Sequence, residues 1–117
     1  MSLPSSSLLL PGPAWPGVRV GVTTRAGGVS APPFDTLNLG DHVGDDPAAV
    51  AHNRARLHEA TPADPCWLRQ VHGTRVHDAD TAHDGPPEAD AAVTTRVGRV
   101  LAILTADCLP VVLTDTH

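Results

Sequence analysis

The fold is decided by the stretch Val100-Leu-Ala-Ile-Leu-Thr-Ala-Asp-Cys-Leu-Pro-Val-Val-Leu-Thr-Asp115. Its two apolar runs, 100–104 and 109–113, are too short for a typical helix and rich in branched aliphatic residues, so each predicts a buried strand. Between them lie Asp107 and Cys108, a carboxylate and a thiol in apolar surroundings. A buried carboxylate is costly unless it is paired or hydrogen-bonded. The pair is therefore a candidate site.

Asp107 and Cys108 also have a purely structural interpretation. Free cysteine is among the most buried residue types and often only fills space. Aspartate often accepts hydrogen bonds from nearby backbone amides in a turn. The pair by itself does not separate these two interpretations, so the rest of the chain has to decide.

The length of 117 residues allows one domain with a modest core and excludes two. The chain is 41% hydrophobic and 18% charged, and its 12 prolines and 10 glycines indicate many loops. We expect residues 1–17 to be an irregular N-terminal segment and residues 18–117 to belong to a single domain. Because an interior strand with nothing after it is unusual, the chain is expected to be part of a longer domain.

Composition also excludes several kinds of partner. Aromatic residues make up only 3% of the chain and the formal net charge is -5, which excludes the stacking platforms and basic faces that bind nucleic acid. The apolar tract at 5–10 lacks the flanks of a signal peptide, and no segment approaches membrane-spanning length. Two cysteines do not make a disulfide framework. We therefore expect a cytoplasmic protein that contacts neither nucleic acid nor membrane.

The first candidate site residue follows a predicted strand. Val18, Val20 and Val22 alternate with other residues, which is the period of a half-buried strand. Arg25 and the turn Ala26-Gly-Gly28 come next, where backbone amides can approach an anion and the guanidinium offers a planar fork to phosphate or carboxylate. An ordinary loop with a solvated arginine is the alternative.

Asn38 is the second candidate. Leu37 and Leu39 flank it at a period of two, so its side chain points away from the side that buries the leucines. Its amide can bind the polar edge of a ligand or simply bond a neighbouring loop.

A helix is predicted from about Pro47 to Ala60. Asp46 is a typical N-cap, and proline is favoured at the first helical position. Val50 and Leu57 lie one heptad apart and would face the core.

Residues 66–71 are again extended, and Gln70-Val-His72-Gly73 ends this segment. Gly73 permits a backbone angle that would turn His72 out of the strand direction. Residues 89–95 predict a further strand, and 97–99 a tight turn into the central stretch.

Four stretches together resemble the YfiH family, whose members are also called laccase-domain proteins, polyphenol oxidoreductases or peptidoglycan editing factors, and which includes the human protein FAMIN. The resemblance covers almost the whole chain, from about residue 18 to 115. Its motifs are Thr23-Thr-Arg-Ala-Gly-Gly-Val-Ser30, Leu37-Asn-Leu-Gly-Asp-His-Val-Gly-Asp-Asp-Pro47, Trp67-Leu-Arg-Gln-Val-His-Gly73 and Thr105-Ala-Asp-Cys-Leu-Pro110.

The resemblance implies a single α/β domain, a layered sandwich of mixed β-sheets covered by helices, of which this chain resembles the N-terminal half. It also implies a zinc enzyme whose metal is held by two histidines and one cysteine. By motif, His72 and Cys108 match two of these ligands. The third belongs to a His-Ala-Gly-Trp-Arg motif expected beyond His117. A thiolate with neutral imidazoles suits Zn²⁺, and three protein ligands leave an open position, as in catalytic sites.

The activity that the family implies is phosphorolysis of purine nucleosides (adenosine, inosine, guanosine or methylthioadenosine), with adenosine deamination as a second activity. The substrates are then a nucleoside and phosphate. Our hypothesis is that zinc and Arg25 position phosphate, while Asn38 and Gln70 contact the nucleoside. Asp107 would orient a ligand or take part in proton transfer.

Two other activities stay open at this point. Copper-dependent oxidation of phenols would match the laccase label, but none of the seven histidines stands two residues from another, as in the His-x-His motifs of multicopper oxidases. A metal-free hydrolase with Cys108 as nucleophile and His72 as base is also chemically plausible. It would fit the editing of peptidoglycan precursors.

Overall fold

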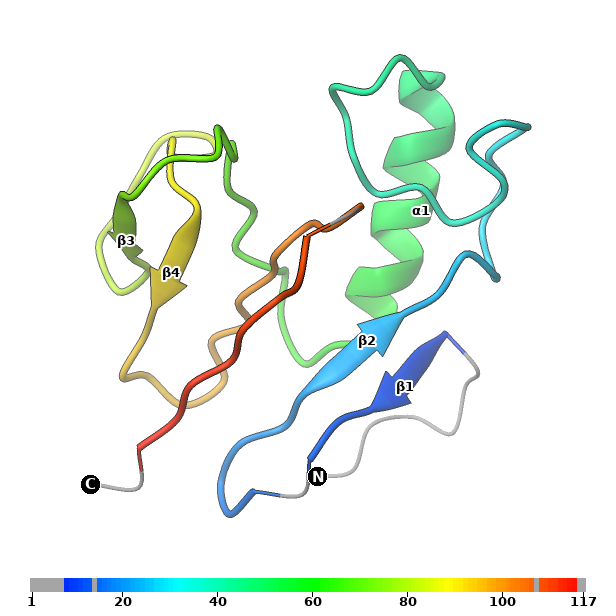
Figure 1. Cartoon of the computed structure of the whole chain (residues 1–117). Coiled ribbons are helices and arrows are strands. Elements are labelled where there is room, and N and C mark those ends of the chain that lie inside the picture. The colour runs from blue at the N-terminus through cyan, green and yellow to red at the C-terminus, as the bar shows by residue number, and fades with distance from the viewer. Residues whose placement is uncertain (1–7, 14, 107, 116–117) are drawn as a thin grey trace. The chain divides into compact units, whose positions relative to one another are not determined.

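The computed structural model describes residues 8–13, 15–106 and 108–115. They form two compact units (Figure 1). The first contains the described residues up to Ala60 together with 112–115, and the second contains Thr61–Val111. Among the described residues, no helix combines the length and the apolar character needed to cross a membrane.

The first unit has a two-stranded antiparallel sheet, β1 (Leu9–Pro11) and β2 (Gly21–Thr23), with Leu9 opposite Thr23. β1 lies inside the segment that was expected to be irregular. Its two leucines gain a partner strand, and a proline at the strand end is tolerated because it costs no ladder bond in mid-sheet. The predicted strand at 18–22 is displaced by a few residues to β2.

The helix α1 (Pro47–Glu59) confirms the predicted helix to within one residue. The Asp46 side chain accepts a hydrogen bond of 3.1 Å from the amide of Ala48, as an N-cap does. Val50 and Leu57 are both buried, as their spacing predicts. α1 therefore turns one apolar stripe toward the loops of its own unit.

Between Val50 and Leu57, α1 buries an asparagine that sequence analysis did not single out. Asn53 is 0% exposed. Its Oδ1 accepts a hydrogen bond of 2.9 Å from the amide of Val29. Its Nδ2 donates to Ser30 Oγ, Thr36 O and Asn38 O at 2.9, 3.3 and 2.8 Å. One side chain thus holds two loops, 29–30 and 36–38, against the helix.

The second unit is built on parallel pairing. β3 (Val76–Asp78) pairs with β4 (Ala91–Val93), with Val76 opposite Ala91. β4 lies within the strand predicted at 89–95, and Gly98 has a φ of 83° in the predicted turn. Leu68, Ala79 and Ala89 are buried, each less than 9% exposed, and form the small core of this unit.

The two apolar runs of the central stretch are not the buried strands that were predicted. In the first run, Leu101 makes an isolated parallel bridge with Cys66. In the second, Leu109, Val111 and Leu113 are 86%, 71% and 89% exposed. A buried strand needs hydrogen-bonded neighbours and cover on its faces, and the described residues provide neither around 109–113. The first run is partly buried, and the second run is apolar but uncovered.

Candidate functional site

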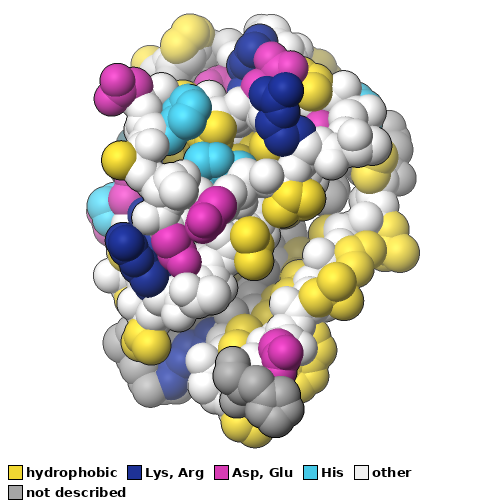
Figure 2. Space-filling model, turned by 90° about the vertical axis from the view of Figure 1, so that its left-hand side faces the viewer, with side chains coloured by type: hydrophobic (Ala, Val, Ile, Leu, Met, Phe, Trp, Pro, Cys, Tyr) yellow, Lys and Arg dark blue, Asp and Glu magenta, His cyan; other side chains and the backbone are white. Residues whose placement is uncertain are grey.

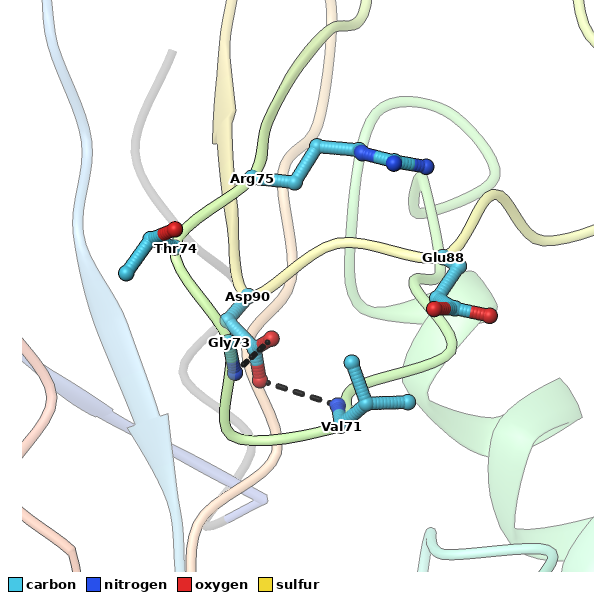
Figure 3. Close-up of a pocket in the computed structure, with 6 residues that line it drawn as sticks. All are labelled: Val71, Gly73, Thr74, Arg75, Glu88 and Asp90. Carbon is cyan, nitrogen blue, oxygen red and sulfur yellow. Dashed lines mark hydrogen bonds between the residues drawn. The ribbon is translucent and has the colours of Figure 1, made fainter.

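The loop that carries His72 is held by a carboxylate (Figure 3). Asp90 Oδ1 accepts hydrogen bonds from the amides of Val71 (3.0 Å) and His72 (2.8 Å), and Oδ2 accepts one from Gly73 (2.7 Å). These bonds, that of Gly73 first, lower the pKa of Asp90 below its ordinary value. The carboxylate is therefore held ionised at neutral pH.

His72 itself adopts the unusual backbone conformation of this loop. Its φ is 57°, in the left-handed region, whereas Gly73 was expected to make the turn. Histidine visits this region more readily than branched residues do, yet the conformation is uncommon. The direction of the imidazole is thus set by His72 and its hydrogen-bonded amide rather than by the freedom of a glycine.

Gln70 connects the His72 segment to the central stretch. Its Nε2 donates to the carbonyl of Leu104 at 2.9 Å, and its Oε1 accepts from the amide of Leu104 at 2.8 Å. Four residues earlier, the amide of Cys66 donates to the carbonyl of Val100 at 2.8 Å. Segment 66–70 therefore runs parallel to segment 100–104.

The two predicted metal ligands follow these parallel segments in the sequence. Cys66 lies opposite Leu101, and seven residues further along each segment are Gly73 and Cys108. His72 and Cys108 are both exposed, and Cys108 is a free thiol. Asp107 and His117 lie outside the described residues. Among the residues that are described, no three His, Cys, Asp or Glu side chains lie close enough to hold a metal ion.

Arg25, in the first unit, is bound to Asp35. Its Nε donates to the carbonyl of Asp35 at 3.0 Å, and its Nη2 lies 3.3 Å from the carboxylate Oδ1. The arginine side chain is still 78% exposed. Such an exposed ion pair adds little stability; its effect is to fix the direction of the guanidinium.

Asn38 binds its own loop. Its Oδ1 accepts from the amide of Gly40 at 3.1 Å, and its Nδ2 donates to Gly40 O and Asp45 Oδ2 at 3.2 and 3.1 Å. Asp45 also accepts from Ser30 Oγ at 2.6 Å. The Ser30 hydroxyl first, and then the Asn38 amide, lower the pKa of Asp45. The side chains of Asn38 and Gln70 thus both bind the chain itself.

A pocket of about 360 Å³ lies beside the His72 loop in the second unit. It is lined by Val71, Gly73, Thr74, Arg75, Glu88 and Asp90. In Figure 3 the Arg75 side chain extends toward the side on which Glu88 lies, and Asp90 faces the loop amides. Glu88 also pairs with Arg69. The pocket therefore offers charged groups of both signs next to the predicted imidazole ligand.

The face of the molecule drawn in Figure 2 carries mixed charges. Arginine, acidic and histidine side chains lie among one another there, and apolar side chains are also exposed.

Family membership follows from comparison with known proteins. Residues 19–117 match the family described as multi-copper polyphenol oxidoreductase laccase. The chain belongs to this family, the YfiH family that its four motifs predict.

Among curated relatives, a purine nucleoside phosphorylase of Mycobacterium tuberculosis is 56% identical over 107 residues, which cover 86% of this chain and 42% of that protein. The purine nucleoside phosphorylase YfiH of Escherichia coli is 48% identical over 104 residues, covering 85% and 43%. The chain therefore spans about two fifths of the length of these relatives.

Solved structures confirm the α/β fold class. A Neisseria meningitidis protein aligns with a TM-score of 0.77 and 41% identity, covering 86% of this chain and 43% of that one. YfiH from Bacillus licheniformis gives a TM-score of 0.75 and 31% identity, covering 89% and 43%. The chain has the fold of about half of a family member, as its resemblance to an N-terminal half predicts.

Asp90 and Asn53 are the residues near the predicted site residues that sequence analysis missed. Asp90 directly precedes the short apolar run at 91–93, where an acidic residue is usual in a turn. Asn53 stands between Val50 and Leu57 on the helix face that the apolar spacing already marks as buried. A polar residue on that face is the one signal from which its role can be inferred.

Proposed function

We propose that this chain provides part of a zinc-dependent purine nucleoside phosphorylase that acts on adenosine, inosine, guanosine and methylthioadenosine and also deaminates adenosine. The names of relatives that are 48% to 56% identical support the phosphorylase activity. The observation in the structure that carries the proposal is the parallel register of segments 66–70 and 100–104. One proposed ligand follows each segment, His72 after Gln70 and Cys108 after Leu104, and the register supports a shared site for the two.

The donors on these segments have the chemistry of a zinc site. A thiolate and a neutral imidazole are the ligands that Zn²⁺ prefers, and both side chains are exposed to an incoming ion. His72 and Cys108 would hold the metal together with a third donor from outside the described residues. Zinc with three protein ligands supplies an open position and a polarised oxygen.

In phosphorolysis, a phosphate oxygen forms a bond to the anomeric carbon of the ribose. The bond from that carbon to the purine nitrogen breaks, and the base leaves with a proton. Arg25 would hold the phosphate: Asp35 engages two of the five guanidinium N–H donors, and the fixed fork suits a tetrahedral anion. Asp107 would protonate the leaving base. In deamination, water would replace the amino group of adenosine and ammonia would leave.

The roles of Asn38 and Gln70 are refined by their bonds to the chain. Both were expected to contact the nucleoside. Because Asn38 binds Gly40 and Asp45, and Gln70 binds Leu104, we propose that they act mainly by holding the loops around the substrate. Any direct contact with the nucleoside would be made in addition to these bonds.

The test is release of hypoxanthine from inosine by the complete protein, with and without phosphate. We expect release that depends on phosphate and that falls in His72→Ala and Cys108→Ser by more than the roughly 10- to 100-fold typical of losing a residue that only orients a metal ligand. His52→Ala is the matched control, since His52 is exposed on α1. Wild-type protein that releases no more hypoxanthine than His72→Ala would contradict the proposal.

Copper-dependent phenol oxidation is the second candidate, because the family description names it. Metal analysis of the same preparations separates the two. Stoichiometric zinc without oxygen uptake supports the phosphorylase, whereas stoichiometric copper with oxygen uptake on a phenol supports the oxidase. Activity that survives chelators but is lost on alkylation of thiols would favour a Cys108–His72 hydrolase instead.

A further inference from the structure

We propose that Asp90 is a positioning residue: it fixes the left-handed backbone conformation of His72 and so presents the imidazole to the metal. The inference rests on the proposed function, because it gives His72 the role of a zinc ligand. Asp90 touches neither metal nor substrate in this proposal. It acts through the backbone of the loop.

The geometry of the loop carries this inference. Three consecutive amides, those of Val71, His72 and Gly73, converge on the two oxygens of the Asp90 carboxylate at 2.7 to 3.0 Å. Successive amides that point into one concavity form a nest that typically binds an anion. In this protein the anion is a side chain of the same unit. Hydrogen bonds to a charged acceptor are stronger than those between neutral groups.

The hydrogen bonds to Asp90 stabilise an unusual backbone conformation of His72. With a φ of 57°, His72 lies in a region that a non-glycine residue adopts only when its surroundings hold it there. In this arrangement of the loop, its own amide donates to Asp90 Oδ1 at 2.8 Å. Loss of the carboxylate would therefore allow the residue to return to an extended conformation and the ring to change direction.

Asp90 is well suited to this role because its own backbone is anchored. Its amide donates to the carbonyl of Arg75 at 3.2 Å, and the residue before it, Ala89, is buried and donates to Arg69 O at 3.2 Å. The residue after it begins β4. On the other side of the loop, Gln70 is fixed to Leu104. The loop is thus held at both ends and at its centre.

Asp80 offers a matched control in the same unit. Like Asp90, it accepts several hydrogen bonds from one loop: from Thr94 Oγ1, and from the amide and hydroxyl of Thr95, both at 2.9 Å. Its bonds involve neither His72 nor the neighbours of His72. Removing it tests what the loss of a loop-binding carboxylate does in general.

The experiment measures Co²⁺ affinity of the complete protein from the thiolate-to-cobalt absorption band, for wild type, Asp90→Ala, Asp90→Asn, Asp80→Asn and His72→Ala. We expect affinity to fall about 10- to 100-fold in Asp90→Ala, the range typical of residues that orient a ligand. Asp90→Asn, which keeps one acceptor oxygen, should lose less. Asp80→Asn should bind as the wild type does. Amide hydrogen exchange at Val71, His72 and Gly73 should accelerate only in the two Asp90 variants.

Each other outcome overturns the inference. If the loop amides exchange faster but cobalt affinity is unchanged, Asp90 is only structural. Equal losses in the Asp90 and Asp80 variants would indicate general destabilisation, and a wild type that binds no cobalt would leave no ligand to position. Cobalt binding without phosphorolysis would contradict the proposed function alone, because the affinity ratios still decide the role of Asp90.

Discussion

The Asn53 side chain links α1 to two loops of the first unit through four hydrogen bonds. Replacement by alanine leaves the amide of Val29 and the carbonyl of Asn38 without this partner in a partly buried place, while the carbonyl of Thr36 keeps its bond from the amide of Ser30. Because unsatisfied buried groups each cost about 1–3 kcal/mol, we expect Asn53→Ala to lower the free energy of unfolding by about 3 kcal/mol. Urea denaturation measures the loss.

Two variants sharpen this prediction. Asn53→Asp keeps the acceptor for Val29 but removes the donors, so it should also destabilise. His52→Ala, exposed on the same helix, should change stability by less than about 0.5 kcal/mol. An Asn53→Ala protein as stable as His52→Ala would show that the hydrogen bonds of Asn53 contribute nothing measurable.

Gly28 lies where there is no room for a side chain. A Cβ at this position would lie 2.2 Å from Thr36 O and 2.6 Å from Asn53 Oδ1. Since both are parts of the buried hydrogen-bond network, we expect Gly28→Ala to cost about 1–3 kcal/mol. Thermal unfolding measures it. Gly40→Ala is the control, because its nearest neighbour would be at 3.6 Å, and a similar loss there would contradict the steric explanation.

At the scale of elements, Asp80 holds the turn that follows β4. Hydrogen bonds from the Thr94 hydroxyl and the Thr95 amide lower the pKa of Asp80 from 3.8 to about 2. The unfolded chain therefore binds more protons than the folded one in this range. The stabilisation by Asp80 is present above about pH 4 and is lost as the pH falls toward 2.

We expect Asp80→Asn to remove this part of the pH dependence. Unfolding curves recorded at a series of pH values between neutral and 2 should show that the difference in the free energy of unfolding between wild type and variant decreases as the pH falls. A difference in the free energy of unfolding that stays constant over the whole pH range would contradict the lowered pKa of Asp80 as its cause.

The sequence predicted those elements whose formation depends on neighbouring residues, such as a helix cap or an alternation of apolar residues. The cap at Asp46 and the proline after it define the start of α1, and the alternation of Leu37 and Leu39 predicts that both are buried. The uncovered state of 109–113 was not predictable in this way. A run of aliphatic residues indicates that burial would be favourable. It does not indicate whether another strand or helix packs against the run.

The sequence singles out two candidate ligands, but not the residues that hold the loop of one of them. His72 and Cys108 stand out by residue type and motif, whereas the bonds from Asp90 to the loop join residues 17 to 19 positions apart in the chain. Such pairing depends on the register of the parallel segments, which no local pattern encodes. Gln70 was singled out for its amide, and only the structure shows that the amide binds Leu104.

At the scale of the whole molecule, the apolar run at 109–113 exposes large aliphatic side chains. Exposed and unpaired apolar segments promote association. We expect Val111→Lys to reduce self-association of the 117-residue chain, measured by light scattering over a range of concentrations. Val97→Lys is the control: Val97 is 105% exposed but stands alone in a turn. Equal effects of the two changes would show that total hydrophobicity, rather than the run, drives association.

The two hydrogen bonds between the Gln70 side chain and Leu104 have a consequence for insertions and deletions. They fix the register of the two segments, with His72 two residues after Gln70 and Cys108 four residues after Leu104. One residue added between Gln70 and His72, or between Leu104 and Cys108, would shift one proposed metal ligand relative to the other, while an addition in the exposed connection at 81–86 would not. In a library of single-residue insertions, metal binding should therefore survive in that connection and disappear in the two short spacers, even where the protein still folds.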